Sequence, residues 1–210
     1  PMASDNKIRV HFKSNHADPD SFPPTFEGES VFAITKERFD NAIQSYPDLK
    51  DKIEPIFDWD LENFYESMKT AEVLVCWDFP TENLAEIAPK LRWIHIIGAG
   101  VEHLCPMDWV PEHVSVVNNR GVHSAKAGEF GLMSVLMLHT HIPEIIQNQQ
   151  KKNWESLYAS PIVVKTVMVI GTGNLGHVAE EKGKLLGMKV MGVSSHGMPL
   201  KGGDKMVTVD

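Results

Sequence analysis

The chain has 210 residues, a formal net charge of −8, and 42% apolar and 23% charged residues. This length can bury a core in one large or two small domains, and the ordinary composition excludes a disordered or fibrous chain. The acidic balance argues against a nucleic-acid partner, because phosphate backbones are bound by clustered Lys and Arg. No run reaches the ~18 apolar residues of a membrane span, so we expect no membrane partner.

The two cysteines, Cys76 and Cys105, are too few for a disulfide framework. Their scarcity also argues against a metal centre of the usual ligand spacing, and we assign no metal site. A reducing compartment suits such a chain, and we expect a cytoplasmic protein.

The first half of the chain alternates between strand-like and helix-like segments. A first strand is expected over residues 7–12, and a loop over residues 14–24. Thr35 is a suitable N-cap for a helix that runs to about Tyr46 and is stopped by Pro47. The later segments are expected, in order, as a strand at 52–57, a helix at 61–70, a strand at 72–77, a helix at 81–88 and strands at 92–97 and 114–117. This spacing predicts a parallel sheet with helices on both faces, whose binding crevice lies beyond the carboxyl ends of the strands.

One strand end carries more information than the others. The strand at 92–97 runs directly into Gly98, Ala99, Gly100 and Val101. Two glycines around an alanine expose a row of backbone amides that suits a small anion such as a carboxylate. A plain turn that needs positive φ explains the same glycines, and the residues alone leave both interpretations open.

The second half begins with a long helix. Ser124 is a suitable N-cap for a helix over 125–139, and Pro143 restarts helical structure to about Trp154. Pro161 then marks the entry to the next strand. We place the domain boundary near residue 120, which gives domains over residues 1–120 and 121–210.

A glycine-rich motif follows the apolar, β-branched run at 163–170. Its residues are Gly171, Thr172, Gly173, Asn174, Leu175 and Gly176, and a helix is expected from Asn174 to Leu186. In the dinucleotide-binding motif the first glycine permits the tight turn, the second admits a pyrophosphate, and the third lets the helix pack on the strand. The amides that begin the helix face the phosphates, and the helix dipole favours an anion there. The flanking strands favour nucleotide binding over an ordinary turn, so we assign these six residues to cofactor binding.

The residues after the next strand bear on the choice of coenzyme. The strand at 189–193 ends in Ser194, Ser195 and His196, which we add to the cofactor site. NAD-preferring domains place an acidic residue about 20 positions beyond the glycines, where it accepts from the ribose hydroxyls. This chain has no carboxylate there to repel a 2′-phosphate, and two hydroxyls and an imidazole can donate to one. The pattern favours NADP and leaves NAD possible, because the arginine usual in NADP-preferring domains is absent.

Several blocks of residues, in this order, together resemble one family. The blocks are 91–104, 117–118, 121–124, 128–130, Trp154, 165–167, 171–176 and 187–190. On these blocks the chain from about Ala71 to Pro199 resembles the D-isomer-specific 2-hydroxyacid dehydrogenases, which include glyoxylate/hydroxypyruvate reductases and phosphoglycerate dehydrogenases.

The resemblance implies an α/β protein with parallel sheets flanked by helices. It implies a flavodoxin-like substrate domain over residues 1–120 and a partial Rossmann NAD(P)-binding domain over 121–210. It also implies hydride transfer between NAD(P)H and a small 2-keto or 2-hydroxy acid, whose carboxylate the turn from Gly98 to Val101 would hold. A homodimer is implied as well, for which the region 125–154 carries enough apolar residues.

The catalytic residues of the family cannot be assigned to this sequence. The family's histidine, its acidic partner and its substrate-orienting arginine lie downstream of the first half of the Rossmann domain. The chain ends at Asp210, after a strand expected at 205–209, so we name no catalytic residue. The resemblance thus implies a C-terminally truncated chain, for which we expect no turnover on its own. Two alternatives stay open: a non-catalytic NAD(P)-binding scaffold that dimerises, and a pseudo-enzyme without a ligand.

Overall fold

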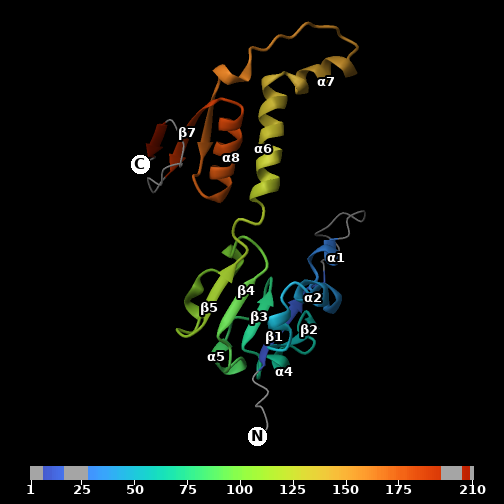
Figure 1. The fold of residues 1–210 in the computed structure, drawn as a ribbon, viewed down its shortest axis with the longest axis vertical. Coiled ribbons are helices and arrows are strands. Elements are labelled where there is room, and N and C mark those ends of the chain that lie inside the picture. Colours follow the sequence, from blue (N-terminus) through green and yellow to red (C-terminus); the bar gives the residue numbers. More distant parts are fainter. Residues whose placement is uncertain (1–6, 17–27, 195–204, 209–210) are drawn as a thin grey trace. The chain divides into compact units, whose positions relative to one another are not determined.

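The computed structural model describes residues 7–16, 28–194 and 205–208. The chain forms two compact units, Pro1–Asn119 and Arg120–Asp210, and each is described by itself (Figure 1). Within the described ranges, every helix is too short or too polar to span a bilayer.

The first unit contains a five-stranded parallel sheet. Its strands are β1 (Ile8–Ser14), β2 (Ile53–Trp59), β3 (Val73–Cys76), β4 (Trp93–Ile96) and β5 (Ser115–Asn118). They lie in the order β2-β1-β3-β4-β5, and every neighbouring pair is parallel. This is the flavodoxin-like strand order, in which the winding reverses beside β1. The predicted parallel sheet is therefore confirmed.

Short helices connect these strands. They are α1 (Gly28–Phe32), α2 (Lys36–Ile43), α3 (Pro47–Lys50), α4 (Phe64–Met68), α5 (Leu84–Ile87) and the 3₁₀ helices η1 (Glu102–Leu104) and η2 (Met107–Trp109). The main core lies on one face of the sheet, where Ile94 and Ile96 of β4 share a fully buried cluster with Phe64 and Met68 of α4. Side chains alternate along a strand, so Trp93 faces the other side, where it is 44% exposed.

The second unit contains a three-stranded parallel sheet and longer helices. Its elements are α6 (Ser124–His139), α7 (Ile142–Gln150), η3 (Ile162–Val164), β6 (Thr166–Ile170), α8 (Asn174–Leu185), β7 (Lys189–Ser194) and β8 (Lys205–Thr208). The strands lie in the order β6-β7-β8. Helix α8 packs on one face of this sheet and α6 packs on α8, as Figure 1 shows. On the other face of β6, Met168 is 56% and Ile170 is 81% exposed.

The helix predicted to reach Tyr46 is shorter than expected. It ends at Ile43, and Pro47, expected to stop it, instead begins α3. Proline suits the first position of a helix, because its missing N–H would have no intrahelical partner there. Thr35 is the N-cap of α2, as predicted, and its hydroxyl accepts from Arg38 N at 3.3 Å.

The predicted N-cap of α6 was wrong. Ser124 is the first residue of the helix, and His123 is the N-cap without a side-chain hydrogen bond. Gly121, at φ +93°, turns the chain early enough for Ser124 N to donate to the Gly121 carbonyl at 3.0 Å. The helix therefore begins one residue sooner than the sequence pattern indicates.

Two further predicted boundaries were wrong in the second unit. Helix α7 ends at Gln150 rather than near Trp154. Lys152 follows in the left-handed conformation, at φ +53°, which a right-handed helix does not continue. The strand expected over 163–170 begins at Thr166, because the residues of η3 form a 3₁₀ turn before it.

Candidate functional site

Backbone conformation and packing restrict two positions of the turn between β6 and α8 to glycine. Gly171 takes φ +89°, which L side chains rarely adopt, and its N–H donates to the Val193 carbonyl at 2.9 Å. A Cβ on Gly176 would lie 2.0 Å from the Gly171 carbonyl oxygen. The first and third glycines are thus required by backbone conformation and by close packing of the helix start on the turn.

Gly173 has no such requirement. Its φ is −75°, which any residue adopts, and a Cβ added there would meet no atom within 4 Å. The neighbouring Thr172 is buried, whereas Leu175 is 54% exposed. The turn therefore leaves free space in front of the backbone of Gly173, where a ligand could approach the chain closely.

The first turn of α8 presents backbone donors to the same space. The first intrahelical bond runs from His177 N to the Gly173 carbonyl at 2.9 Å, and His177 Nδ1 donates to that carbonyl at 3.0 Å. In the described chain, the amides of Asn174, Leu175 and Gly176 donate to no backbone carbonyl. The first turn contains no acidic residue, so no carboxylate of this turn offsets the positive end of the helix dipole. These groups fit a diphosphate.

The turn after β4 is the second candidate site. A Cβ on Gly98 would lie 2.1 Å from Cζ3 of Trp77, and one on Gly100 would lie 2.2 Å from Oε2 of Glu102. Neither glycine has a positive φ. The alternative of a turn that needs positive φ was therefore wrong. The Trp77 ring leaves no room for a side chain at Gly98, whereas the exposed Glu102 side chain can move away from Gly100.

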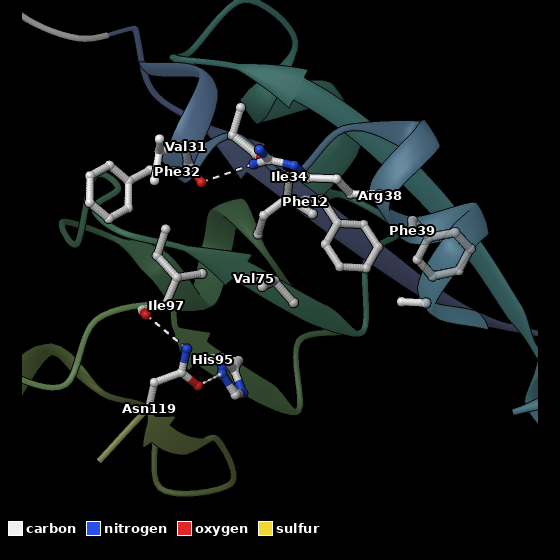
Figure 2. A pocket seen from close by; sticks show the side chains of 12 residues that line it. Phe12, Val31, Phe32, Ile34, Arg38, Phe39, Val75, His95, Ile97 and Asn119 are labelled. Atoms are coloured by element: carbon white, nitrogen blue, oxygen red, sulfur yellow. Dashed lines mark hydrogen bonds between the residues drawn. The ribbon is translucent and has the colours of Figure 1, made fainter. Parts of the chain in front are cut away.

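An aromatic pair borders this turn. The rings of Trp77 and His103 are stacked, with centroids 4.1 Å apart, and His103 Nε2 donates to the Trp77 carbonyl at 2.8 Å. A pocket of about 460 Å³ lies between α2 and the sheet, and Ile97 and Asn119 at one end of it lead into the turn (Figure 2).

A family model matches the part of the chain that contains the glycine turn between β6 and α8. Residues 132–209 match the family model described as D-isomer specific 2-hydroxyacid dehydrogenase, NAD binding domain. The second half of the chain is therefore similar to the NAD binding domain of that family. The predicted resemblance is thus confirmed, and the family's NAD-binding region includes the glycine turn, α8, β7 and β8.

Curated and solved relatives extend the match. D-3-phosphoglycerate dehydrogenase of Synechocystis sp. is 26% identical over 113 residues, which are 53% of this chain and 20% of that protein. A D-isomer specific 2-hydroxyacid dehydrogenase from Xanthobacter autotrophicus Py2, in complex with NADPH and MES, has a TM-score of 0.68 at 19% identity over 97% of this chain and 57% of that chain. An NADPH-dependent glyoxylate/hydroxypyruvate reductase from Sinorhizobium meliloti has a TM-score of 0.63 at 22% identity over 97% and 57%.

A third solved relative carries the other coenzyme. D-lactate dehydrogenase from Aquifex aeolicus, complexed with NAD and lactic acid, has a TM-score of 0.60 at 20% identity over 96% of this chain and 56% of that chain. The dehydrogenase fold therefore extends over nearly the whole chain. The chain spans little more than half the length of these solved relatives and a fifth of the curated one.

The structure brings most of the predicted cofactor residues together. Gly171 through Gly176 form one turn, and Val193, which precedes Ser194, bonds to that turn through Gly171. Ser194 is buried at the end of β7, beside β6. Ser195 and His196 lie outside the described residues. The predicted substrate residues Gly98 to Val101 form their turn in the other unit, and the roles of all these residues stay predictions.

Two histidines of the described chain have hydrogen-bond partners. His95 Nε2 lies 2.7 Å from Asn119 Oδ1, and His139 Nε2 donates to the Ser160 carbonyl. His11 is fully buried, and burial lowers its pKa, against an opposing effect of Asp58. Among the described residues, no three His, Cys, Asp or Glu side chains are grouped as metal ligands.

Two residues beside the turn were not selected from the sequence. Asn118 is the last residue of β5 and Asn119 follows it. The side chain of Asn118 donates to the Ala99 carbonyl, and that of Asn119 donates to the Ile97 carbonyl just before the turn. Their position at the carboxyl end of a strand was the available signal, because parallel sheets bind ligands at that edge.

Proposed function

We propose that the whole protein is an oxidoreductase that transfers a hydride between NAD(P)H and a small 2-keto or 2-hydroxy acid. In its activity we expect it to resemble the glyoxylate/hydroxypyruvate reductases. The observation that carries the proposal is the open space at Gly173 beside the unpaired amides of α8, within the region that matches the family's NAD-binding model. Under this proposal the first unit binds substrate and the second binds coenzyme.

The second unit would hold the coenzyme's diphosphate at the start of α8. The amides of Asn174, Leu175 and Gly176 donate to the phosphate oxygens, and Gly173 allows their close approach. His177 holds the Gly173 carbonyl away from the anion through its Nδ1–H. The coenzyme, when bound, supplies the nicotinamide that exchanges the hydride.

The first unit would hold the substrate's carboxylate on the amides of the turn from Gly98 to Val101. Backbone donors need no counter-charge and remain donors at every pH. The stacked rings of Trp77 and His103 lie beside this turn, and we propose that they restrict the substrate to a short side chain. No residue of the described chain is assigned as general acid or base.

We propose NADP as the preferred coenzyme, with NAD as the possible alternative. Ser194 ends β7, next to the glycine turn, where the adenosine ribose of a bound dinucleotide would lie. Relatives solved with NADPH and with NAD both share the fold, so the fold does not decide between them. Parallel titrations of the 210-residue chain with NADPH and NADH are the test. Tighter binding of NADH would overturn the preference.

We also propose a cytoplasmic homodimer that pairs through the second unit. Large apolar side chains of this unit are exposed in the single chain, among them Phe130 at 66%, Leu138 at 69% and Trp154 at 91%. A second copy would remove this area from water. The cytoplasm suits the two free thiols, of which Cys76 is buried and Cys105 is exposed.

Turnover separates this function from its alternatives. Reduction of glyoxylate or hydroxypyruvate by the whole protein, followed as loss of NADPH absorbance, is the expected result. Binding of NADPH without turnover would instead indicate a non-catalytic scaffold, and loss of both would indicate a pseudo-enzyme without a ligand.

A further inference from the structure

We propose that Asn119, together with Asn118, is a positioning residue that aims the amides of the Gly98 turn at the substrate's carboxylate. This inference rests on the proposed function, because it concerns the same turn. It assigns to two asparagines at the end of β5 and just after it a role that the motifs of the sequence do not indicate.

Three consecutive carbonyls of the turn are held by the end of β5. Asn119 Nδ2 donates to the Ile97 carbonyl at 2.8 Å, and Asn119 N donates to the Gly98 carbonyl at 2.9 Å. Asn118 Nδ2 donates to the Ala99 carbonyl at 2.9 Å. The carbonyl oxygens of Ile97, Gly98 and Ala99 are therefore fixed on the side of β5.

Because the peptide bond is planar, these three hydrogen bonds also determine where the neighbouring N–H groups point. In a trans peptide the C=O and the following N–H point to opposite sides. With the three carbonyls directed at β5, the N–H groups of Gly98, Ala99 and Gly100 point away from it. In the described part of the chain these three amides donate to no carbonyl. They form a row of donors of the kind that binds an anion.

His95 holds Asn119 in place from the other side. Because Asn119 Nδ2 donates to the Ile97 carbonyl, its Oδ1 is the atom that faces His95 Nε2, at 2.7 Å (Figure 2). An amide oxygen only accepts, so His95 must carry a proton on Nε2. Both ends of the Asn119 amide are thus fixed, and the side chain cannot flip without losing both bonds.

The substitution Asn119→Asp tests the proposal with little change in shape. The substitution replaces the amide that donates to the Ile97 carbonyl by a carboxylate oxygen, which repels that carbonyl. One of the three hydrogen bonds that fix the turn is then lost. The probe is glyoxylate, titrated into the ¹⁵N-labelled 210-residue chain, with NADPH titrated separately. We expect the glyoxylate dissociation constant to rise at least about tenfold, with the NADPH dissociation constant within about twofold of the unsubstituted chain.

Two more variants distinguish a loss of positioning from general damage to the fold. Asn118→Ser removes the side-chain bond to the Ala99 carbonyl and keeps both bonds of Asn119 to the turn, and we expect a smaller loss of glyoxylate affinity than for Asn119→Asp. Ser115→Ala, at the exposed first residue of the same strand, is the matched control and should bind glyoxylate normally. A loss of NADPH affinity equal to that of glyoxylate would overturn the positioning role, because it would show general damage.

The outcomes distinguish this inference from the proposed function. Glyoxylate that shifts the amides of Gly98, Ala99 and Gly100 equally in both chains would overturn the inference and leave the function standing. Glyoxylate binding that depends on Asn119, in a chain that never binds NADPH, would support the positioning role and overturn the function. No response of these amides to glyoxylate in the unsubstituted chain would overturn the carboxylate site and the inference together.

Discussion

Two of the three glycines in the turn between β6 and α8 are required by the structure, and the third is not. Gly171 needs its positive φ, Gly176 needs contact with the Gly171 carbonyl, and Gly173 needs neither. A glycine that neither backbone conformation nor packing requires favours a bound ligand as its explanation. Such a glycine distinguishes a ligand-binding turn from a purely structural one. The distinction can be tested one glycine at a time.

The substitution Gly173→Ala should weaken coenzyme binding without weakening the fold. The added Cβ enters open space, so the free energy of unfolding should stay within about 0.5 kcal/mol of the original. The same Cβ would occupy the approach of the diphosphate, so the NADPH dissociation constant should rise at least about tenfold. Calorimetric titration and urea unfolding measure the two effects.

Gly131→Ala is the matched control for that substitution. It lies inside α6, and an added Cβ there also meets no atom within 4 Å. We expect unchanged NADPH binding and a gain in stability of about 0.5–1 kcal/mol, because glycine is a poor helix former. Equal NADPH binding by the two variants and the unsubstituted chain would contradict the role given to Gly173.

The buried His11 makes the stability of the chain depend on pH. Its side chain is fully buried, neither ring nitrogen has a hydrogen bond in the described chain, and Asp58 Oδ2 lies 3.5 Å from Nε2. Burial, opposed by Asp58, lowers its pKa from the ordinary 6.5. The unfolded chain therefore takes up the proton first, and stability that is complete above pH 6.5 is lost as the pH falls through the folded pKa.

The substitution His11→Leu should flatten this dependence. Urea unfolding of the original chain should lose at most about 1.4 kcal/mol per pH unit from this group below its ordinary pKa. The His11→Leu variant should lack that contribution, and the exposed-site control His113→Gln should retain it. Parallel pH profiles for the original chain and His11→Leu would show that His11 is not the group responsible.

Sequence alone predicts some of these residues and not others, for a physical reason. The requirement for glycine at 171 and 176 follows from contacts within six residues, so a local motif carries it. The bonds of Asn118 and Asn119 to the Gly98 turn join residues 19 and 22 positions apart. Such contacts depend on which strands are neighbours in the sheet, and no local pattern indicates them.

At the scale of elements, the order of strands and helices was predictable and several of their ends were not. Apolar alternation indicates a strand over most of its length, so each strand of the parallel sheets was expected near its observed place. Helix ends depend on single backbone conformations, such as the left-handed Lys152 after α7 or the Gly121 turn before α6. A Lys at positive φ leaves no signal in the sequence, because lysine rarely adopts that conformation.

The close contact between α6 and α8 can be tested by substitution. A Cβ on Gly128 would lie 2.2 Å from Cγ1 of Val178, so the two helices approach through a glycine. The substitution Gly128→Ala should lower the free energy of unfolding by about 1–3 kcal/mol, because the helices must separate or Val178 must change rotamer.

A double-mutant cycle isolates this contact. Val178→Ala removes Cγ1, so the added methyl of Gly128→Ala should cost much less in its presence than alone. Urea unfolding of the two single variants, the double variant and the original chain gives the coupling energy. Additive losses within about 0.5 kcal/mol would show that the close contact is not what limits position 128.

At the scale of the whole molecule, the second unit carries more exposed apolar surface than a solitary unit needs. Trp154 is 91% and Tyr158 is 87% exposed, on a segment that follows α7. We predict that the chain sediments as a dimer and that Trp154→Lys shifts it to monomer at equal concentration. Tyr46→Lys, at a 61% exposed aromatic of the first unit, is the control and should remain a dimer. A monomer at high concentration in the original chain would contradict the pairing.

The central claim is that the start of α8 binds the diphosphate of a nicotinamide coenzyme. Its most direct test is a titration of NADPH into the ¹⁵N-labelled chain, observed at the backbone amides of residues 171–176. Saturable shifts of Asn174, Leu175 and Gly176 are predicted, because these amides have no acceptor within the described chain. Unchanged amides in this turn at saturating NADPH would contradict the claim, even if the nucleotide bound elsewhere.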